Sequence, residues 1–372
     1  MNYKYKKYLN KKAITEPCFP HKKPQKNKYD FIISIPSYYE FDYLFKTLDS
    51  ISNQDKSLLD RTIVSIIINN SSSESNQDVI KNNYDTYKKL INSKYNFEFI
   101  AIDAFSKKYA IDNKKAGVGI ARKISIDLFL EYMHFKTIIC FLDADTEIPE
   151  NYLYEINKSQ LEHNWASAVV DFHHLDDHIK TKALIYKYET FLKDTAKNLK
   201  EVGSPYSFVP LGCTMLCRLD GYIGVGGMNT RKAAEDFYFL QELKKCYDVH
   251  YIDNIQVRPS ARHINRSYLG TSKRMFDALN GNLNIQDLYF SKEKYEIIKM
   301  FLRFVLNSKD LKADLILLKT KEINQRLYLF LKEHRFESVW PSIQSSKSYV
   351  QFENQFHKWF DFLKTIKLLK YI

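Results

Sequence analysis

The chain has 372 residues, 45% of them hydrophobic, which is enough for one large domain or two smaller ones around a sizeable core. No uninterrupted apolar stretch approaches the roughly 20 residues of a membrane-spanning helix, and the lysine-rich start lacks the apolar middle of a signal peptide. The five cysteines are odd in number, which suits a reducing compartment better than a disulfide framework. We therefore expect a globular, cytoplasmic protein.

The net charge of +12 raises the question of nucleic-acid binding, because Lys and Arg neutralise phosphates. The excess follows a general richness in lysine, however, and is concentrated only at the two ends of the chain. We expect no nucleic-acid partner. A non-enzymatic basic protein that binds nucleic acid or a membrane remains the alternative.

The first 29 residues carry many lysines and show no sustained periodicity, so we expect a basic N-terminal arm over 1–29. Residues 29–36 then form a short apolar run that ends in proline, and residues 41–51 have apolar side chains at helical spacing. This pattern predicts a strand followed by a helix.

The strand and helix pattern recurs three times along the chain. The further strands are predicted at 62–70, 97–103 and 137–145, each followed by a helical pattern. Strands that are apolar on both faces and alternate with helices indicate an α/β fold, with a mostly parallel sheet covered by helices on both sides.

After Val170 the alternation weakens. The pattern predicts a long helix over 179–199, a strand near 209–218 and a helix from about 233. Residues 275–372 read as a C-terminal helical extension of a domain spanning 30–274. Its last apolar stripe, which includes Phe352 and Phe356, has two interpretations: packing onto the catalytic domain, or peripheral attachment to an anionic membrane at its inner face.

Polar residues follow the predicted strands, and ligands bind at the carboxyl ends of such strands. Asp143 and Asp145 terminate the fourth apolar run. Carboxylates at alternate positions suit a hard cation such as Mg²⁺ or Mn²⁺. A solvated turn and an acidic helix start are the other interpretations of this pair.

Three more residues near predicted helix starts bear on the chemistry. Arg122 follows the sequence GVGIA, so it could lie with helix-start amides beside an anion, although a glycine loop alone explains the pattern. Glu235 and Asp236 are candidates for a general base, and an ordinary acidic first turn is the alternative.

Taken in order, five motifs resemble the inverting family-2 glycosyltransferases, which have the GT-A fold and use nucleotide-sugar donors. The motifs are ISIPSYYE, IIINNSSSES, NKKAGVGIARKISID, CFLDADTEIPENYL and GCTMLCRLDGYIGVGGMNTRKAAEDFYFLQEL. The chain departs from the family at Tyr39 and Lys123, where asparagine is usual, and at Asn69 and Asn70, where aspartate is usual.

The resemblance implies a role for each matching position. Asp145 and Asp143 would bind Mn²⁺ or Mg²⁺, with Asp145 the direct ligand and His263 a third group near the metal. Asp236 would be the general base, with Glu235 second. The nucleotide would contact a set of residues from the strand ends and helix starts: Pro36, Tyr38, Glu40, Asn69, Asn70, Arg122, Asp143 and Arg262.

These assignments predict a metal-dependent glycosyltransferase that moves a sugar from a UDP-sugar to an acceptor hydroxyl with inversion. The acceptor would be a glycan or a lipid-linked molecule, in the synthesis of a surface polysaccharide or other glycoconjugate. A metal-dependent nucleotidyltransferase, which attacks phosphorus and releases pyrophosphate, is the alternative enzyme.

Overall fold

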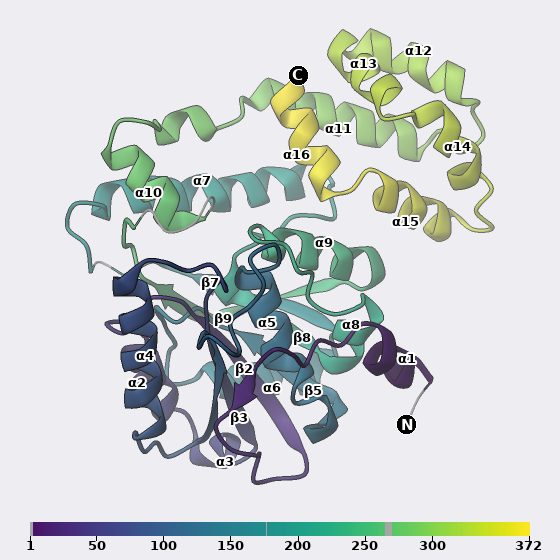
Figure 1. Cartoon of the computed structure of the whole chain (residues 1–372). Coiled ribbons are helices and arrows are strands. Elements are labelled where there is room, and N and C mark those ends of the chain that lie inside the picture. Colours follow the sequence, from purple (N-terminus) through teal and green to yellow (C-terminus); the bar gives the residue numbers. More distant parts are fainter. Residues whose placement is uncertain (1–2, 176, 265–269) are drawn as a thin grey trace. The chain divides into compact units, whose positions relative to one another are not determined.

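The computed structural model describes residues 3–175, 177–264 and 270–372 (Figure 1). By their internal contacts, the residues form two compact units. The first unit runs to Tyr186 and resumes at Pro210–Leu283, and the second comprises Lys187–Val209 and Asn284–Ile372.

A nine-stranded sheet forms the centre of the first unit, in the order β1-β4-β3-β2-β5-β8-β7-β9-β6. The strands are β1 (Phe19–Pro20), β2 (Tyr29–Ser37), β3 (Thr62–Asn69), β4 (Glu98–Ala104), β5 (Met133–Phe141), β6 (Thr146–Glu147), β7 (Ser167–Phe172), β8 (Met215–Arg218) and β9 (Val249–Pro259). Strands β4, β3, β2 and β5 are parallel, whereas β8 is antiparallel to β5 and β7. Every residue of β3 is buried, as expected for a strand covered on both faces. The predicted α/β class is confirmed.

Helices cover both faces of the sheet because the direction in which strands are added to the sheet reverses between β4 and β5. The helices of this unit are α1 (Tyr3–Lys11), α2 (Leu44–Ser52), α3 (Lys56–Leu59), α4 (Gln77–Ile91), α5 (Val118–Asp127), α6 (Tyr152–His163), α8 (Leu219–Gly224), α9 (Glu235–Cys246) and α10 (Thr271–Leu279). Helices α2 and α4 lead from β2 to β3 and from β3 to β4, whereas α5 leads back to β5 on the other side of β2. Since such crossovers are right-handed, α5 lies on the face opposite to α2 and α4. Ligands bind at this kind of switch point.

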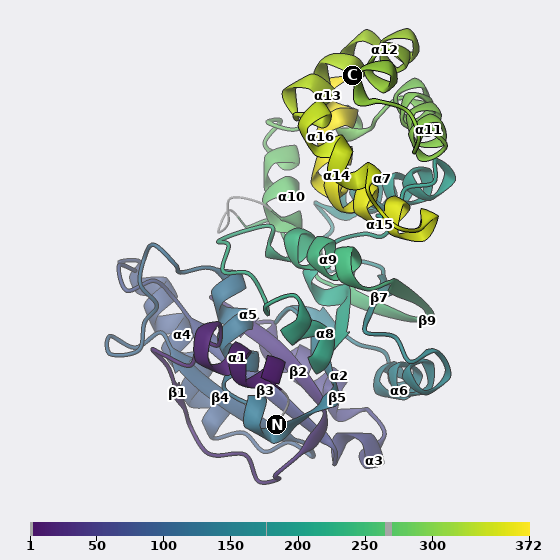
Figure 2. The ribbon, with the colours of Figure 1, turned by 90° about the vertical axis from the view of Figure 1, so that its right-hand side faces the viewer.

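The N-terminal segment, predicted to be a separate basic arm, belongs to the first unit. Figure 2 shows α1 beside α5 and α8. Tyr5 and Tyr8 are buried, and β1 pairs with β4. Lysines stand between these tyrosines in the sequence, so the apolar spacing of the helix is easily overlooked.

The second unit is helical, in line with the predicted C-terminal region. It contains most of α7 (Lys182–Glu201) and the helices α11 (Lys292–Leu306), α12 (Ala313–Ile323), α13 (Gln325–Glu333), α14 (Phe336–Gln344), α15 (Tyr349–Trp359) and α16 (Phe362–Tyr371). The predicted boundary at 275 falls inside α10, and the second unit also includes α7 from Lys187 onward.

The apolar stripe near the C-terminus does not form one exposed face. A break at Phe360 separates α15 from α16, and Phe352, Phe356 and Phe360 are buried against the unit's own core, where Phe301 contacts two of them. These three side chains therefore pack within the second unit itself, where packing onto the catalytic domain was expected, and they do not form an exposed membrane-binding face. No helix among the described residues is long and apolar enough to cross a membrane.

Candidate active site

The carboxyl ends of β2, β3 and β5 meet at one edge of the sheet because the three strands are parallel neighbours. The residues that follow them include Glu40, Asn70, Asp143 and Asp145. Two buried arginines from other elements reach this edge and bind the two aspartates separately.

Arg122, in the middle of α5, connects the end of β5 to the start of α9. Its Nη2 lies 2.5 Å from Oδ1 of Asp143, and its Nε lies 3.3 Å from Oε1 of Glu235. The Arg122 side chain is only 1% exposed. Its Nη1 makes no hydrogen bond to any described residue. A buried guanidinium with an unused donor is suited to bind an additional anionic group.

Gly212 makes room for this guanidinium. A Cβ at this position would overlap Nη2 of Arg122. Sequence reasoning missed Gly212, although a glycine in a predicted strand is itself a signal that another group approaches closely.

Arg262 forms a second, more saturated cluster. It follows β9, whose pairing with β6 brings it next to the end of β5. Its Nη1 and Nη2 donate to both oxygens of Glu40 at 2.6 Å, and Nη2 also lies 2.6 Å from Oδ2 of Asp145. The guanidinium stacks over the ring of Tyr43, 4.6 Å from its centre. The pairing of Glu40 with Arg262 was not predicted, since 222 positions separate the two residues.

Glu235 and Asp236 open α9, after Ala234 in a left-handed conformation. Glu235 is buried, and Asp236 is half-buried. Burial raises the pKa of both carboxyl groups; the neighbouring Asp236 raises the pKa of Glu235 further, whereas Arg122 lowers both. The main-chain N–H of Phe237 donates to Oδ1 of Asp236 at 2.7 Å, which also lowers the pKa of that carboxyl. A carboxyl group with a raised pKa beside a charged partner is a good candidate for proton transfer.

Polar atoms without partners mark the ends of β2 and β3. Oγ of Ser37 and Oδ1 of Asn69 and Asn70 are buried and make no hydrogen bond to a described residue. Such groups cost free energy unless a ligand or water pairs with them. Tyr38, also predicted here, donates its hydroxyl to Oε2 of Glu74 at 2.8 Å. Pro36, the remaining predicted contact, lies in β2 one residue before Ser37.

The aspartates fit a divalent cation only in part. Within the described residues, no group of three or more His, Cys, Asp or Glu side chains is arranged to hold a metal, so His263 does not complete a set with Asp143 and Asp145. Each aspartate pairs with its arginine through one oxygen, and its second oxygen forms no ion pair among the described residues. Two such oxygens match the way Mg²⁺ binds one or two carboxylates together with substrate phosphates.

His263 and His178 lie beside this edge, next to Tyr43 and Arg262. The His263 ring packs edge-on against His178, with ring centres 5.9 Å apart, and its buried Nδ1 has no partner among the described residues. Asp177 accepts hydrogen bonds from the Ser260 hydroxyl and the Ala261 N–H, so it holds the loop that carries Arg262.

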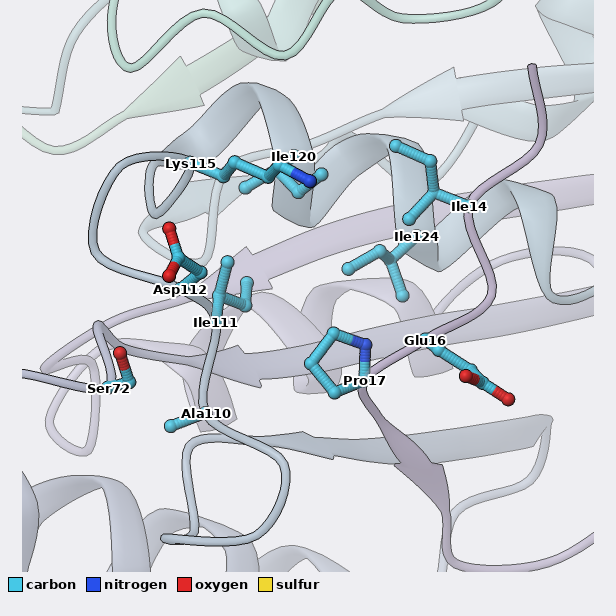
Figure 3. Close-up of a pocket in the computed structure, with 10 residues that line it drawn as sticks. All are labelled: Ile14, Glu16, Pro17, Ser72, Ala110, Ile111, Asp112, Lys115, Ile120 and Ile124. Atoms are coloured by element: carbon cyan, nitrogen blue, oxygen red, sulfur yellow. The ribbon is translucent and has the colours of Figure 1, made fainter. Parts of the chain in front are cut away.

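A pocket of about 290 Å³ lies between the N-terminal segment and α5 (Figure 3). Isoleucines form much of its wall, including Ile14, Ile120 and Ile124. It shares no residue with the two arginine clusters, so it is not the site of the carboxylate chemistry.

No protein-family profile matches the chain, and no curated protein matches it by sequence. Solved structures with a similar fold include residues 1–349 of S. aureus TarS in complex with UDP-GlcNAc, at 12% identity and a TM-score of 0.46, covering 88% of this chain and 91% of that one. Another is the mannosyltransferase PcManGT from Pyrobaculum calidifontis in complex with GDP-Man and Mn²⁺, at 12% identity and a TM-score of 0.42, covering 99% of this chain and 92% of that one. A likeness at this level transfers neither residues nor substrates to this chain.

Proposed function

We propose that the protein is a metal-dependent, inverting GT-A glycosyltransferase that uses a nucleoside-diphosphate sugar as donor. We expect this donor to be a UDP-sugar. The observation that carries the proposal is the network around Arg122. This residue joins a strand-end aspartate, Asp143, to the carboxyl pair Glu235 and Asp236, whose pKa values are raised by burial. The five motifs in family order support the same function.

The donor would bind across the switch point between β2 and β5. The unpaired oxygens of Asn69 and Asn70 can accept hydrogen bonds from a base or a ribose, and uracil offers a suitable N–H. The unused Nη1 of Arg122 can donate to a diphosphate oxygen. These contacts would orient the sugar relative to the start of α9.

Asp143 and Asp145 would hold the divalent ion through their second oxygens, together with the donor phosphates. The chemistry supplied by such an ion is stabilisation of the negative charge on the departing diphosphate. Arg122 adds a fixed positive charge on the same side, and its position does not depend on solvent because it is buried.

Asp236 would accept the proton of the acceptor hydroxyl. As the hydroxyl oxygen bonds to the anomeric carbon, the bond from this carbon to the phosphate oxygen breaks, and the diphosphate leaves with the electron pair. One displacement without a protein nucleophile inverts the configuration. Glu235 suits the base role less well, because it is more buried and pairs with Arg122.

A thermal-shift panel of UDP, GDP and CDP, with and without Mn²⁺, tests the donor and metal parts of this proposal. We expect one diphosphate to raise the melting temperature of the wild type in the presence of Mn²⁺, and the shift to disappear in Asp145→Ala. Asp248→Ala is a matched control, because the Asp248 side chain is 98% exposed. No shift with any diphosphate, or a shift that is independent of the metal, would contradict the proposal.

The by-product of the reaction distinguishes a glycosyltransferase from a nucleotidyltransferase. A glycosyltransferase releases a nucleoside diphosphate, whereas a nucleotidyltransferase acting on a nucleoside triphosphate releases pyrophosphate. We expect the diphosphate only.

A further inference from the structure

A buried polar cluster lies on α5 next to Arg122, on a different side of the helix. Asp127 is its centre: Oδ1 accepts hydrogen bonds from the hydroxyls of Tyr8 at 2.7 Å and Tyr222 at 3.1 Å, and Oδ2 accepts from the main-chain N–H of Ile14 at 2.8 Å. Lys123 Nζ lies 3.1 Å from Oδ2 and donates to the Tyr8 hydroxyl at 2.5 Å. The four side chains are all buried, so each contact is made away from water.

This cluster ties the N-terminal helix α1 to the helix that carries Arg122. Lys123 directly follows Arg122, and consecutive side chains point roughly 100° apart around a helix axis. The same turn of α5 therefore contacts Asp143 and Glu235 on one side and Tyr8 on another. Charged networks with low exposure define a geometry more strictly than apolar contacts do.

A pocket of about 290 Å³ lies next to these polar contacts, between the N-terminal segment and α5 (Figure 3). Ile14 and Pro17 line it from the N-terminal segment, and Ile120 and Ile124 line it from α5. The hydrogen bonds to Asp127 are therefore direct polar contacts between two segments that leave a cavity along part of their length.

The cluster also reaches the loop that leads to Asp236. A Cβ at Gly227 would overlap the Tyr8 hydroxyl and approach Lys123 Nζ to 2.7 Å. Further along this loop, the backbone at Asn229 and Arg231 lies against Gly119, where an added Cβ would come within 2.6 Å of either carbonyl oxygen. The loop before α9 therefore packs closely against α5 at Gly119 and against the contact between Tyr8 and Lys123 at Gly227.

We propose that Tyr8 is a positioning residue: through Lys123 and Asp127, its hydroxyl sets the placement of Arg122 relative to Asp143 and Glu235. The catalytic consequence rests on the proposed glycosyl transfer, but the positioning itself does not. The N-terminal segment is then part of the active site's support.

Tyr8→Phe removes only the hydroxyl and keeps the ring, which packs edge-on against Tyr222. Tyr5→Phe is a closely matched control. Tyr5 lies on the same helix, is equally buried, and donates its hydroxyl to the main-chain oxygen of Leu130 at 2.6 Å, outside the cluster. Tyr8→Phe loses two buried hydrogen bonds and Tyr5→Phe loses one, so a purely structural role predicts a loss of stability in both variants and no change at Arg122 in either.

The placement of Arg122 is measured by NMR on protein labelled with ¹⁵N-arginine. The Nε–Hε resonance of Arg122 is identified by its absence in Arg122→Lys. We expect it to move in Tyr8→Phe and to stay in Tyr5→Phe. An unchanged resonance in Tyr8→Phe, or equal movement in both variants, would overturn the inference.

Release of nucleoside diphosphate from the donor sugar measures the catalytic consequence. We expect kcat to fall about tenfold in Tyr8→Phe, since small misplacements of a charged group reduce rates strongly, and to stay unchanged in Tyr5→Phe. If Tyr8→Phe and Tyr5→Phe lost kcat equally, in proportion to their lower melting temperatures, this would also count against the inference. If the wild type releases no diphosphate, the proposed function fails, while the NMR comparison still decides the positioning.

Discussion

The two arginine clusters at the sheet edge have similar composition but differ in how completely they are paired. Arg262 donates to both oxygens of Glu40 and contacts Asp145, so its terminal nitrogens are used. Arg122 makes one short contact to Asp143 and a longer one to Glu235, and one of its terminal nitrogens is unpaired. A guanidinium whose two terminal nitrogens are both paired suits a brace between two strand ends, and only the Nε of Arg262 makes no hydrogen bond to a described residue. Incomplete pairing, next to carboxyl groups with raised pKa values, suits a site that binds and reacts.

The largest effect is expected at the reactive cluster. Asp236→Asn removes the proposed base and should lower transfer by about 10² to 10⁴-fold, while nucleoside diphosphate binding stays near the wild-type level. Steady-state rates and thermal shifts measure the two quantities. Asp248→Asn is the control, and lost diphosphate binding in Asp236→Asn would reassign the residue to the donor site.

The two arginines should differ in their effect on folding stability. Arg262→Met leaves the buried Glu40 and the half-buried Asp145 without their cation and should reduce the free energy of unfolding by about 3 to 5 kcal/mol. Arg122→Met should cost less, because the Asp143 side chain is 36% exposed and Glu235 can take up a proton. Urea unfolding of both variants makes this comparison. If Arg122→Met lost more free energy of unfolding than Arg262→Met, Arg122 would be the brace and Arg262 would belong to the reactive cluster.

The pH dependence of stability tests the raised pKa values. A carboxyl group whose pKa is raised by folding binds more protons in the folded state than in the unfolded state, so its contribution is complete below the unfolded pKa of about 4 and is lost as pH rises through the folded pKa. Glu235→Gln removes this titration. We therefore expect the free energy of unfolding of the variant to fall less steeply with rising pH than that of the wild type, by up to about 1.4 kcal/mol per pH unit between the unfolded and folded pKa values. Urea unfolding between pH 5 and 8, taken as the difference from wild type, measures it, and parallel curves would contradict the raised pKa.

The smallest effect concerns the room made for Arg122. Gly212→Ala should destabilise the fold by about 1 to 3 kcal/mol, because its Cβ displaces the guanidinium from Asp143. In an Arg122→Ala background the same substitution should cost much less. Urea unfolding of the four proteins gives the coupling, and additive losses would show that the overlap is relieved elsewhere.

The elements of the sheet were predictable because their sequences contain apolar runs that end abruptly. The run at 62–70 predicts a strand, and the structure has β3 at Thr62–Asn69, buried throughout. The helix predicted from about 233 begins at Glu235. Helix α1 was missed because lysines alternate with its buried tyrosines, and burial of a tyrosine depends on partners that come from α5 and α8.

Local patterns determined which residues follow the strands, since each polar group is placed by the run that precedes it. Asp143, Asp145, Glu235 and Asp236 could therefore be selected from the chain itself. Which arginine binds which carboxylate was decided only when distant segments came together, as with Arg262 and Glu40. Long-range pairing depends on strand order and on the space left by Gly212, and neither leaves a periodic signal in the sequence.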